Sequence, residues 1–498
     1  MAISPMLRGL RSGFGKLAIV SGFALILVIL ALPTFALPGD QPATVDPAIA
    51  ATATTDMAVA PDSQSTVAPA PKPYGPRWIH QDTFLNWGPE RQRWADKGFS
   101  FDFHYISDNL GDLRVNSDNP RSASQWHEDG FHDWQRIRGT VDWDFGKSTS
   151  AKGLSFHATG VWQNGTNMGG IIGSIANPSG ITSSHQFRLD SIWLQQTFYK
   201  NEIQVTAGIM AAQDFYGVCC DGAYVAEPMF YNFGNMGNTR MSYDPESAPG
   251  VNLKITPDKH FYVQSGYYLP SNDFGDASTS NGYPSGFVYK ANHYGATSDT
   301  EVGYYTDPTP SATRKSYPGY YRAGFVYNGS NGTNSAVPHC NPIMGCSGFY
   351  DYSSGKYVDN NYSFYFWGLQ PVFRTTAGSN RGLDLWGGFN VGPQNKSQVP
   401  TEIIAGVIFN GPIPTRSKDS LAAGVTYSKL GSDWKTWEKA NVDPTCTFCS
   451  DERQFEVNYL AQVFNWLTIQ PVYQYYANVG GRNNGSATVA GFRLITHF

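Results

Sequence analysis

Several polar or aromatic residues stand where an alternating pattern would place them together on one surface. They are Asp102, His104, Arg136, Arg138, Asp142, Asp144, Trp193, Gln195, Glu456 and Arg493. Guanidinium groups donate hydrogen bonds in a fork and carboxylates accept them, so the set suits a ligand that carries many hydroxyl groups. Trp193 adds an amphipathic ring for the C–H face of such a ligand, with Gln195 on the same strand face.

Each of these residues also has a purely structural interpretation. Paired arginine and aspartate side chains often only neutralise one another and brace a protein wall. Trp193 could instead join an aromatic belt at a lipid surface, and Arg493 could serve only to position the last strand. The sequence leaves both interpretations open.

The cysteines form three close pairs, at Cys219/Cys220, Cys340/Cys346 and Cys446/Cys449. No second Cys-x-x-Cys and no suitably spaced histidine pair completes a zinc site, so we expect loop-closing disulfides of undetermined pairing and no metal. The sequence also lacks Gly-x-Ser-x-Gly, and no Ser/His pair stands out. Neither a catalytic residue nor a cofactor is therefore predicted.

The elements that must position these side chains repeat with a period of two residues. In Gly98–Asp108 and Glu202–Ala211, for example, apolar and polar residues alternate, which is typical of strands with one apolar and one polar face. The pattern predicts strands that start near residues 99, 134, 154, 188, 203, 251, 261, 287, 300, 321, 363, 383, 402, 419, 453, 467 and 488. Single-chain bacterial barrels contain an even number of strands, so at least one of these predictions must be wrong.

So many alternating strands indicate an all-β, antiparallel transmembrane barrel of about 16 strands, or 18, with a water-filled lumen. Tight connections at Tyr199–Asn201 and Pro257–Asp258 alternate with long segments at 212–248 and 328–360, as the two rims of such a barrel require. In the last strand, Phe492, Leu494 and the terminal Phe498 share one face. We interpret these three residues as an assembly signal for the barrel.

The composition agrees with this fold class. Of the 498 residues 14% are aromatic and only 15% are charged, which argues against a disordered chain, a coiled coil and a nucleic-acid binder. Outside the N-terminus no apolar run of about 18 residues occurs, so a helical membrane bundle is excluded. The modest hydrophobic share of 41% is an average over a lipid-facing and a lumen-facing surface.

The N-terminal region predicts export. Residues 1–36 combine basic residues, an apolar stretch and small residues up to Ala36, which is typical of a signal peptide; an uncleaved anchor is the alternative. Cleavage near Ala36 would leave 32 basic and 40 acidic residues, a net charge of −8. Residues 37–76 contain 17 Ala and Pro residues and predict a periplasmic lead or linker. Residues 77–97 would include a short helix, and residues 98–498 the barrel.

Four blocks of the sequence resemble the carbohydrate-selective OprB family of outer-membrane porins. They are Asn86–Gly88 with Trp94 and Lys97–Tyr105; Trp193–Phe198 with Val205–Gly208; Gly406–Arg416 with Asp419, Gly424 and Val425; and Glu456, Tyr459, Trp466–Leu467, Ile469–Pro471, Gln474, Gly480–Gly481 and Gly491–Arg493. Asn86–Arg91 is a looser version of the family segment, and the inserts that carry cysteines depart from it. The resemblance implies a bacterial outer-membrane barrel that passes mono- or small oligosaccharides by facilitated diffusion.

Other functions compete with this interpretation. A general diffusion porin for small hydrophilic solutes is the alternative within the same fold, and an outer-membrane enzyme or a secreted carbohydrate-binding protein are alternatives outside it. The expected partners are sugars, outer-membrane lipid and the barrel-assembly machinery, with no nucleic acid because the chain is acidic. The sugar, the constriction and the choice between monomer and trimer are not predicted.

Overall fold

The computed structural model describes residues 88–116, 131–182, 186–217, 223–226, 238–239, 241–244, 247–269, 296–306, 319–329, 349–358, 360–377 and 379–498. The predicted signal peptide, the linker 37–76 and the predicted strand near 287 lie outside these residues, as do Cys219, Cys220, Cys340 and Cys346.

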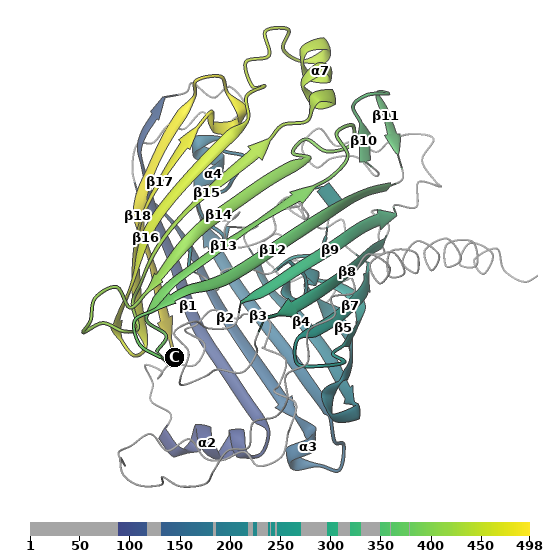
Figure 1. The fold of residues 1–498 in the computed structure, drawn as a ribbon, viewed down its shortest axis with the longest axis vertical. Coiled ribbons are helices and arrows are strands. Elements are labelled where there is room, and N and C mark those ends of the chain that lie inside the picture. Colours follow the sequence, from purple (N-terminus) through teal and green to yellow (C-terminus); the bar gives the residue numbers. More distant parts are fainter. Residues whose placement is uncertain are drawn as a thin grey trace, which may run out of the picture. The chain divides into compact units, whose positions relative to one another are not determined.

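Sixteen strands within the described ranges form one closed antiparallel barrel (Figure 1). They are β1 (Phe99–Asn116), β2 (Phe131–Asp144), β3 (Leu154–Gly165), β4 (Gln186–Phe198), β5 (Ile203–Met210), β6 (Ala248–Ile255), β7 (Phe261–Tyr268), β8 (Ala296–Tyr305), β9 (Tyr320–Gly329), β12 (Asn360–Arg374), β13 (Gly382–Val391), β14 (Thr401–Asn410), β15 (Ser420–Lys429), β16 (Glu452–Phe464), β17 (Leu467–Ala477) and β18 (Ser486–His497). The barrel predicted from the alternating pattern is thereby confirmed at the lower of the two strand counts.

Each strand pairs with its neighbours in chain order, and β1 closes the ring by pairing with β18. His104 lies opposite His497 in this closing pair, and Asn109 lies opposite Phe492. β7 pairs directly with β8, so these two described strands are neighbours in the ring. Closure leaves no strand edge exposed, which is the condition for a sheet in hydrocarbon.

The two faces of the wall differ as the two-residue period predicts. Large apolar side chains such as Phe364, Ile403 and Val425 point outward and are about half exposed. Polar side chains such as Glu456 and Gln474 alternate with them and point inward. The apolar side chains therefore face lipid, and the polar ones face the lumen.

The two ends of the barrel carry different elements (Figure 1). Helix α2 (Gly88–Asp96), helix α3 (Phe145–Ser148) and the C-terminus lie at one end, and helix α7 (Ser432–Asn441) and the hairpin of β10 (Phe349–Asp351) and β11 (Lys356–Val358) lie at the other. Turns near α2 are short, as at the 3-10 helix η2 (Tyr199–Asn201), and longer connections lie near α7. No helix within the described ranges is long and apolar enough to cross a membrane.

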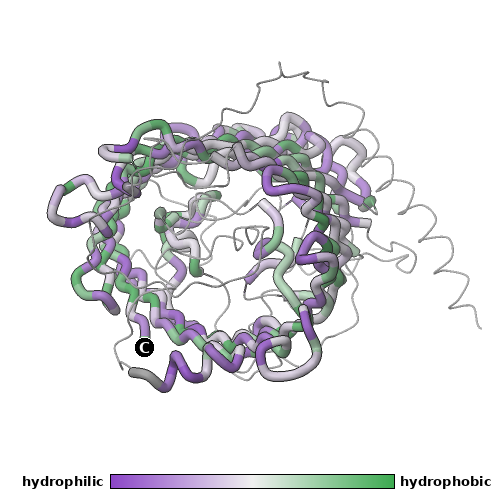
Figure 2. Tube along the Cα trace, turned by 60° about the horizontal axis from the view of Figure 1, so that its bottom comes forward, coloured by the Kyte–Doolittle hydropathy of each residue, from purple (hydrophilic) through white to green (hydrophobic). Residues whose placement is uncertain are grey.

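Two long connections fold into the barrel, where Figure 2 shows chain segments inside the ring of strands. The first follows β3 and contains α4 (Met168–Ile172), which packs with Leu110 of β1 and Val472 of β17. The second follows β5, contains the 3-10 helix η3 (Ala212–Asp214) and includes residues 223–226 and 241–244. A further 3-10 helix, η6 (Val479–Gly481), joins β17 to β18.

Candidate functional site

The lumen face of β2, β3 and β4 brings a carboxylate, an imidazole and an indole into one row. Asp142, His157 and Trp193 are register partners on these three adjacent strands. His157 Nδ1 lies 2.7 Å from Asp142 Oδ1, and its ring stacks on that of Trp193 with 4.5 Å between centroids and 13° between planes. We call Asp142, His157 and Trp193 the lumen row.

The lumen row presents both hydrogen-bonding and aromatic surface. The side chain of Asp142 is 51% exposed, so its carboxylate keeps acceptor capacity beyond the bond to His157. His157 Nε2 lies 2.9 Å from the Thr159 hydroxyl, and these two contacts together fix the imidazole plane. Trp193 also makes an edge contact with Phe215 of the inward connection, with 6.5 Å between ring centroids.

The end of the lumen row depends on a glycine. Gly208 of β5 is the register partner of Trp193 and has φ +151°, a conformation that residues with side chains rarely adopt. A Cβ atom added there would lie 2.3 Å from the Ile192 carbonyl oxygen. Gly208 therefore lets β5 approach β4 closely beside the indole.

Trp193 and Gln195 lie on the same, inward face of β4. A register shift between β3 and β4 leaves both Asp190 and Ser191 buried. Beyond this irregularity Leu194 points outward and the alternation resumes. Gln195 accepts a hydrogen bond from the Thr206 hydroxyl at 3.2 Å.

Arg136 and Arg138 converge on a single carboxylate of the inward connection, Asp244. Arg136 is hydrogen-bonded to Asp244 Oδ1, and Arg138 Nη1 lies 2.5 Å from Asp244 Oδ2. The Arg136 side chain is 4% exposed, whereas that of Arg138 is 21% exposed and approaches Asp190. Arg136 thus braces the connection against the wall, and Arg138 is the member of the pair that still reaches the lumen.

Glu456 points inward, but residues of the inward connection cover it. Val225 N and Ala226 N each donate to its carboxylate at 2.8 Å, one to each oxygen. Asn458 Nδ2 and Gln474 Nε2 donate to the same oxygens from the wall, at 2.7 and 3.0 Å. Glu456 is 0% exposed, so its observed contacts are those of a tether for residues 223–226.

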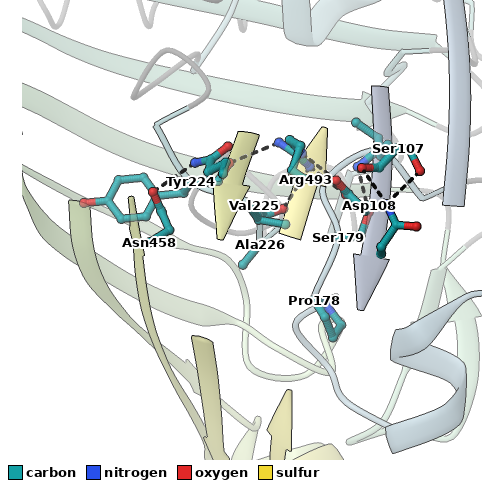
Figure 3. A network of polar contacts seen from close by, with 12 residues as sticks. Ser107, Asp108, Pro178, Ser179, Tyr224, Val225, Ala226, Asn458 and Arg493 are labelled. Carbon is teal, nitrogen blue, oxygen red and sulfur yellow. Dashed lines mark hydrogen bonds and ion pairs between the residues drawn. The ribbon is translucent and has the colours of Figure 1, made fainter. Parts of the chain in front are cut away.

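Arg493 holds the same segment from β18 (Figure 3). Its Nε and Nη2 atoms donate to the two oxygens of Asp108 at 2.6 and 2.8 Å. The guanidinium also donates to the carbonyl oxygens of Tyr224 and Val225, and the Ser179 hydroxyl donates to Asp108 at 2.6 Å. One buried ion pair therefore fixes both inward connections to the wall.

The remaining predicted lining residues lie nearer the end that carries α2. Asp102 Oδ2 lies 2.9 Å from His104 Nδ1, and His497 Nδ1 lies 3.6 Å from Asp102 Oδ1. Asp144 ends β2, where its carboxylate accepts from Gly146 N and caps α3. Asp144 N also donates to Gly98 O at 2.8 Å, so this residue connects the start of α3 to the start of β1.

The residues interpreted as an assembly signal lie on β18 and at the C-terminus. Phe492 and Leu494 point outward on β18, and Phe498 N donates to Phe103 O at 2.9 Å.

Cys446 and Cys449 form a disulfide with Cα atoms 5.3 Å apart, in the connection between α7 and β16. This disulfide closes the Cys-x-x-Cys segment.

Three contributors to the site were not predicted from the sequence. His157 alternates with Phe156 and Ala158 in a predicted strand, so the two-residue period could have indicated that it faces the lumen. Asp244 and Tyr224 belong to a long connection that has no periodic signal. Tyr224 Oη nevertheless donates toward the carbonyl oxygens of Val407 and Ala423 and accepts from Trp386 Nε1 at 2.8 Å.

Comparisons with known proteins agree with this architecture. The family model described as carbohydrate-selective porin, OprB family, matches residues 129–498. Porin B of Pseudomonas aeruginosa is 25% identical over 446 residues, which cover 85% of this chain and 91% of that protein. The high-pH structure of Pseudomonas putida OprB has a TM-score of 0.68 at 19% identity and covers 84% of this chain and 100% of its own, so it shares the fold.

Proposed function

The chain belongs to the OprB family of carbohydrate-selective porins, and we propose that sugars cross its lumen along the lumen row and Arg138. It is a passive channel rather than an enzyme, and carbohydrates are its substrates. The observation that carries the residue assignment is the alignment of Asp142, His157 and Trp193 across three strands beside the partly exposed Arg138.

The chemistry of this surface matches that of a sugar ring. A pyranose carries hydroxyl groups around its edge and C–H groups on its faces. Asp142 accepts from hydroxyl groups, Arg138 donates to them, and the indole of Trp193 covers a C–H face. Contacts of this kind are individually weak, so a sugar can leave as readily as it enters.

The inward connections would narrow the lumen to the width of a small saccharide. Glu456 and Arg493 hold residues 223–226, and Arg136 holds Asp244, so the chain inside the barrel is fixed at both places. We expect these three residues to set the pore width, and Arg138 and the lumen row to contact the sugar.

Liposome swelling tests the selectivity. Vesicles that carry the protein should swell faster in mono- or disaccharides than in amino acids of similar size. Equal rates would favour the second candidate, a general diffusion porin for small hydrophilic solutes.

Ion conductance in the presence of sugar tests the assigned residues. Asp142→Asn and Arg138→Gln should each weaken the block of ion current by sugar, because each removes a charged hydrogen-bonding group. Asp133→Asn, in the same strand with its carboxylate bonded to Gln135, is the control and should keep the wild-type block. Unchanged block in both lumen variants would place the sugar contact elsewhere.

The chain is an outer-membrane protein. We propose the following steps for its export and assembly. Cleavage near Ala36 would release the signal peptide, and residues 37–76 would remain in the periplasm as a linker before the helical segment 77–97 and the barrel 98–498. The outward faces of Phe492 and Leu494 would contact lipid, and the last strand with Phe498 would be read by the assembly machinery. Mass spectrometry of the mature N-terminus tests the cleavage position.

A further inference from the structure

Asp299 of β8 is a buried carboxylate that has no hydrogen-bond partner among the residues that the structure describes. It points inward and is 0% exposed, and neither of its oxygens accepts a hydrogen bond. Other buried carboxylates within the described ranges have at least one oxygen with a polar partner, as Asp108, Asp244 and Glu456 illustrate. Asp299 stands apart because both of its oxygens lack one.

The neighbouring carboxylate, Glu301, is equally buried but has a full set of hydrogen bonds. Glu301 lies two residues further along the same face of β8 and is also 0% exposed. Its oxygens accept four hydrogen bonds, from Tyr262 Oη at 2.6 Å, Tyr365 Oη at 2.7 Å, Gly217 N at 2.8 Å and Gln264 Nε2 at 2.9 Å. These four donors are thus directed to Glu301, and no donor within the described ranges reaches Asp299.

Further unpartnered oxygens lie beside Asp299. Thr297 is two residues away on the same face, and Asn328 of β9 is its register partner. Thr297 Oγ1 and Asn328 Oδ1 are buried and have no hydrogen-bond partner in the described part of the chain. The Asn328 amide is oriented, because its Nδ2 donates to Thr239 O at 2.8 Å and leaves the carbonyl oxygen free.

A tyrosine hydroxyl adds another oxygen from the third strand. Tyr268 of β7 is the register partner of Thr297, and its ring turns back over Gly266, the register partner of Asp299. A Cβ atom at Gly266 would lie 3.0 Å from Tyr268 Oη, so the hydroxyl occupies the space that this glycine leaves. Three adjacent strands therefore direct oxygen atoms to the surroundings of one carboxylate.

Protonation alone does not satisfy this group. One added proton supplies a single donor, which can serve at most one of the neighbouring oxygens and leaves the others without a partner, and an isolated buried carboxylate is far more costly. A cation bound between the oxygens resolves both problems, because it serves as the common partner of the carboxylate, the amide carbonyl and the hydroxyl.

We propose that Asp299, Thr297 and Asn328, with the Tyr268 hydroxyl, bind a hard metal cation of the Ca²⁺ class inside the barrel wall. The donor set is entirely oxygen and mixes a carboxylate with neutral ligands, as Ca²⁺ accepts. It contains a single carboxylate, and no three His, Cys, Asp or Glu side chains within the described ranges are arranged to hold a metal. The affinity is therefore that of a weak site, with a dissociation constant on the order of 0.1–1 mM.

Calcium binding to the purified full-length protein in detergent tests this site. After treatment with EDTA and transfer to about 10 mM CaCl₂, an excess over such a dissociation constant, the wild type should unfold several degrees higher than in EDTA. Equilibrium dialysis should find one Ca²⁺ per chain. Asp299→Asn should lose both effects, and Asp133→Asn, a matched carboxylate at the rim end of β2, should keep them.

Two further variants keep the test decisive if Asp299→Asn fails to fold. Asn328→Asp adds a negative ligand and should tighten Ca²⁺ binding about tenfold, whereas Thr297→Val removes a neutral ligand and should weaken it. Equal affinities in these two variants would overturn the proposal. The proposal would also be overturned if the unfolding temperature of the wild type were the same with and without Ca²⁺, or if the Asp299→Asn protein bound Ca²⁺ as the wild type does.

Discussion

Replacing Glu456 by glutamine should release residues 223–226 from the barrel wall. Glutamine has the same shape, but one carboxylate oxygen becomes an NH₂ group that faces a backbone N–H of Val225 or Ala226. A hydrogen bond to a charged group contributes about 1.5–3 kcal/mol, and the surviving bond to a neutral oxygen contributes about 1 kcal/mol less than before. The tether should therefore weaken by about 3 kcal/mol, which is roughly a hundredfold in the population of the detached segment.

Single-channel recording in planar lipid bilayers measures this population directly. With residues 223–226 detached the lumen widens, so Glu456→Gln channels should spend roughly a hundredfold more time at a higher conductance than wild-type channels. Sugar block should fall in the same high-conductance state, because the widened lumen holds a sugar less closely.

Asp384→Asn is the matched control for this experiment. Asp384 is also a buried lumen carboxylate, but it contacts Arg374 and Asn410, which belong to strands of the wall. Its replacement should leave the conductance states unchanged. A folded Glu456→Gln channel with wild-type conductance and noise would refute the tether, as would equal effects of the two substitutions.

Three further outcomes are expected. Arg493→Met leaves Asp108 buried without its ion-pair partner and should cost about 3–5 kcal/mol, seen as a lower temperature at which the barrel unfolds in heat-modifiability gels; an unchanged temperature would contradict it. Trp193→Ala should weaken sugar block more than Trp193→Phe, which keeps a ring, and equal block in both would remove the indole from the sugar path. Hydrogen bonds from the Thr445 hydroxyl and Thr447 N hold the pKa of Asp443 well below its usual range. That carboxylate therefore stabilises its loop above about pH 4 and ceases to do so as the pH falls through the lowered pKa. Hydrogen exchange at Thr447, corrected for intrinsic rates, should show this loss in the wild type and not in Asp443→Asn.

The barrel could be predicted from the sequence because lipid imposes a simple rule on each strand. Every second residue meets hydrocarbon, so residues such as Phe455 and Val457 alternate with Glu456 and Asn458 over the whole strand. Local irregularities weaken the signal only briefly, as the register shift at Asp190 does within β4.

The roles of the inward-facing residues could not be predicted in the same way. Alternation places Glu456, Arg493 and Trp193 on one kind of surface, but it does not say what lies against them. Trp193 stacks on its register partner, whereas Glu456 and Arg493 bind the backbone of a connection hundreds of residues away. That connection has no periodicity, and backbone N–H and carbonyl groups carry no residue-specific signal.

The tether to residues 223–226 also has a consequence for the order of assembly. Its bonds span the chain, with 231 residues between Val225 and Glu456 and 269 between Tyr224 and Arg493. Contacts so distant in sequence close late, after the entropy of a long loop has been lost. Until β16 and β18 are in place, residues 223–226 lack the bonds to Glu456 and Arg493. The nascent barrel is therefore wide first and acquires its narrow, selective lumen only when its last strands arrive.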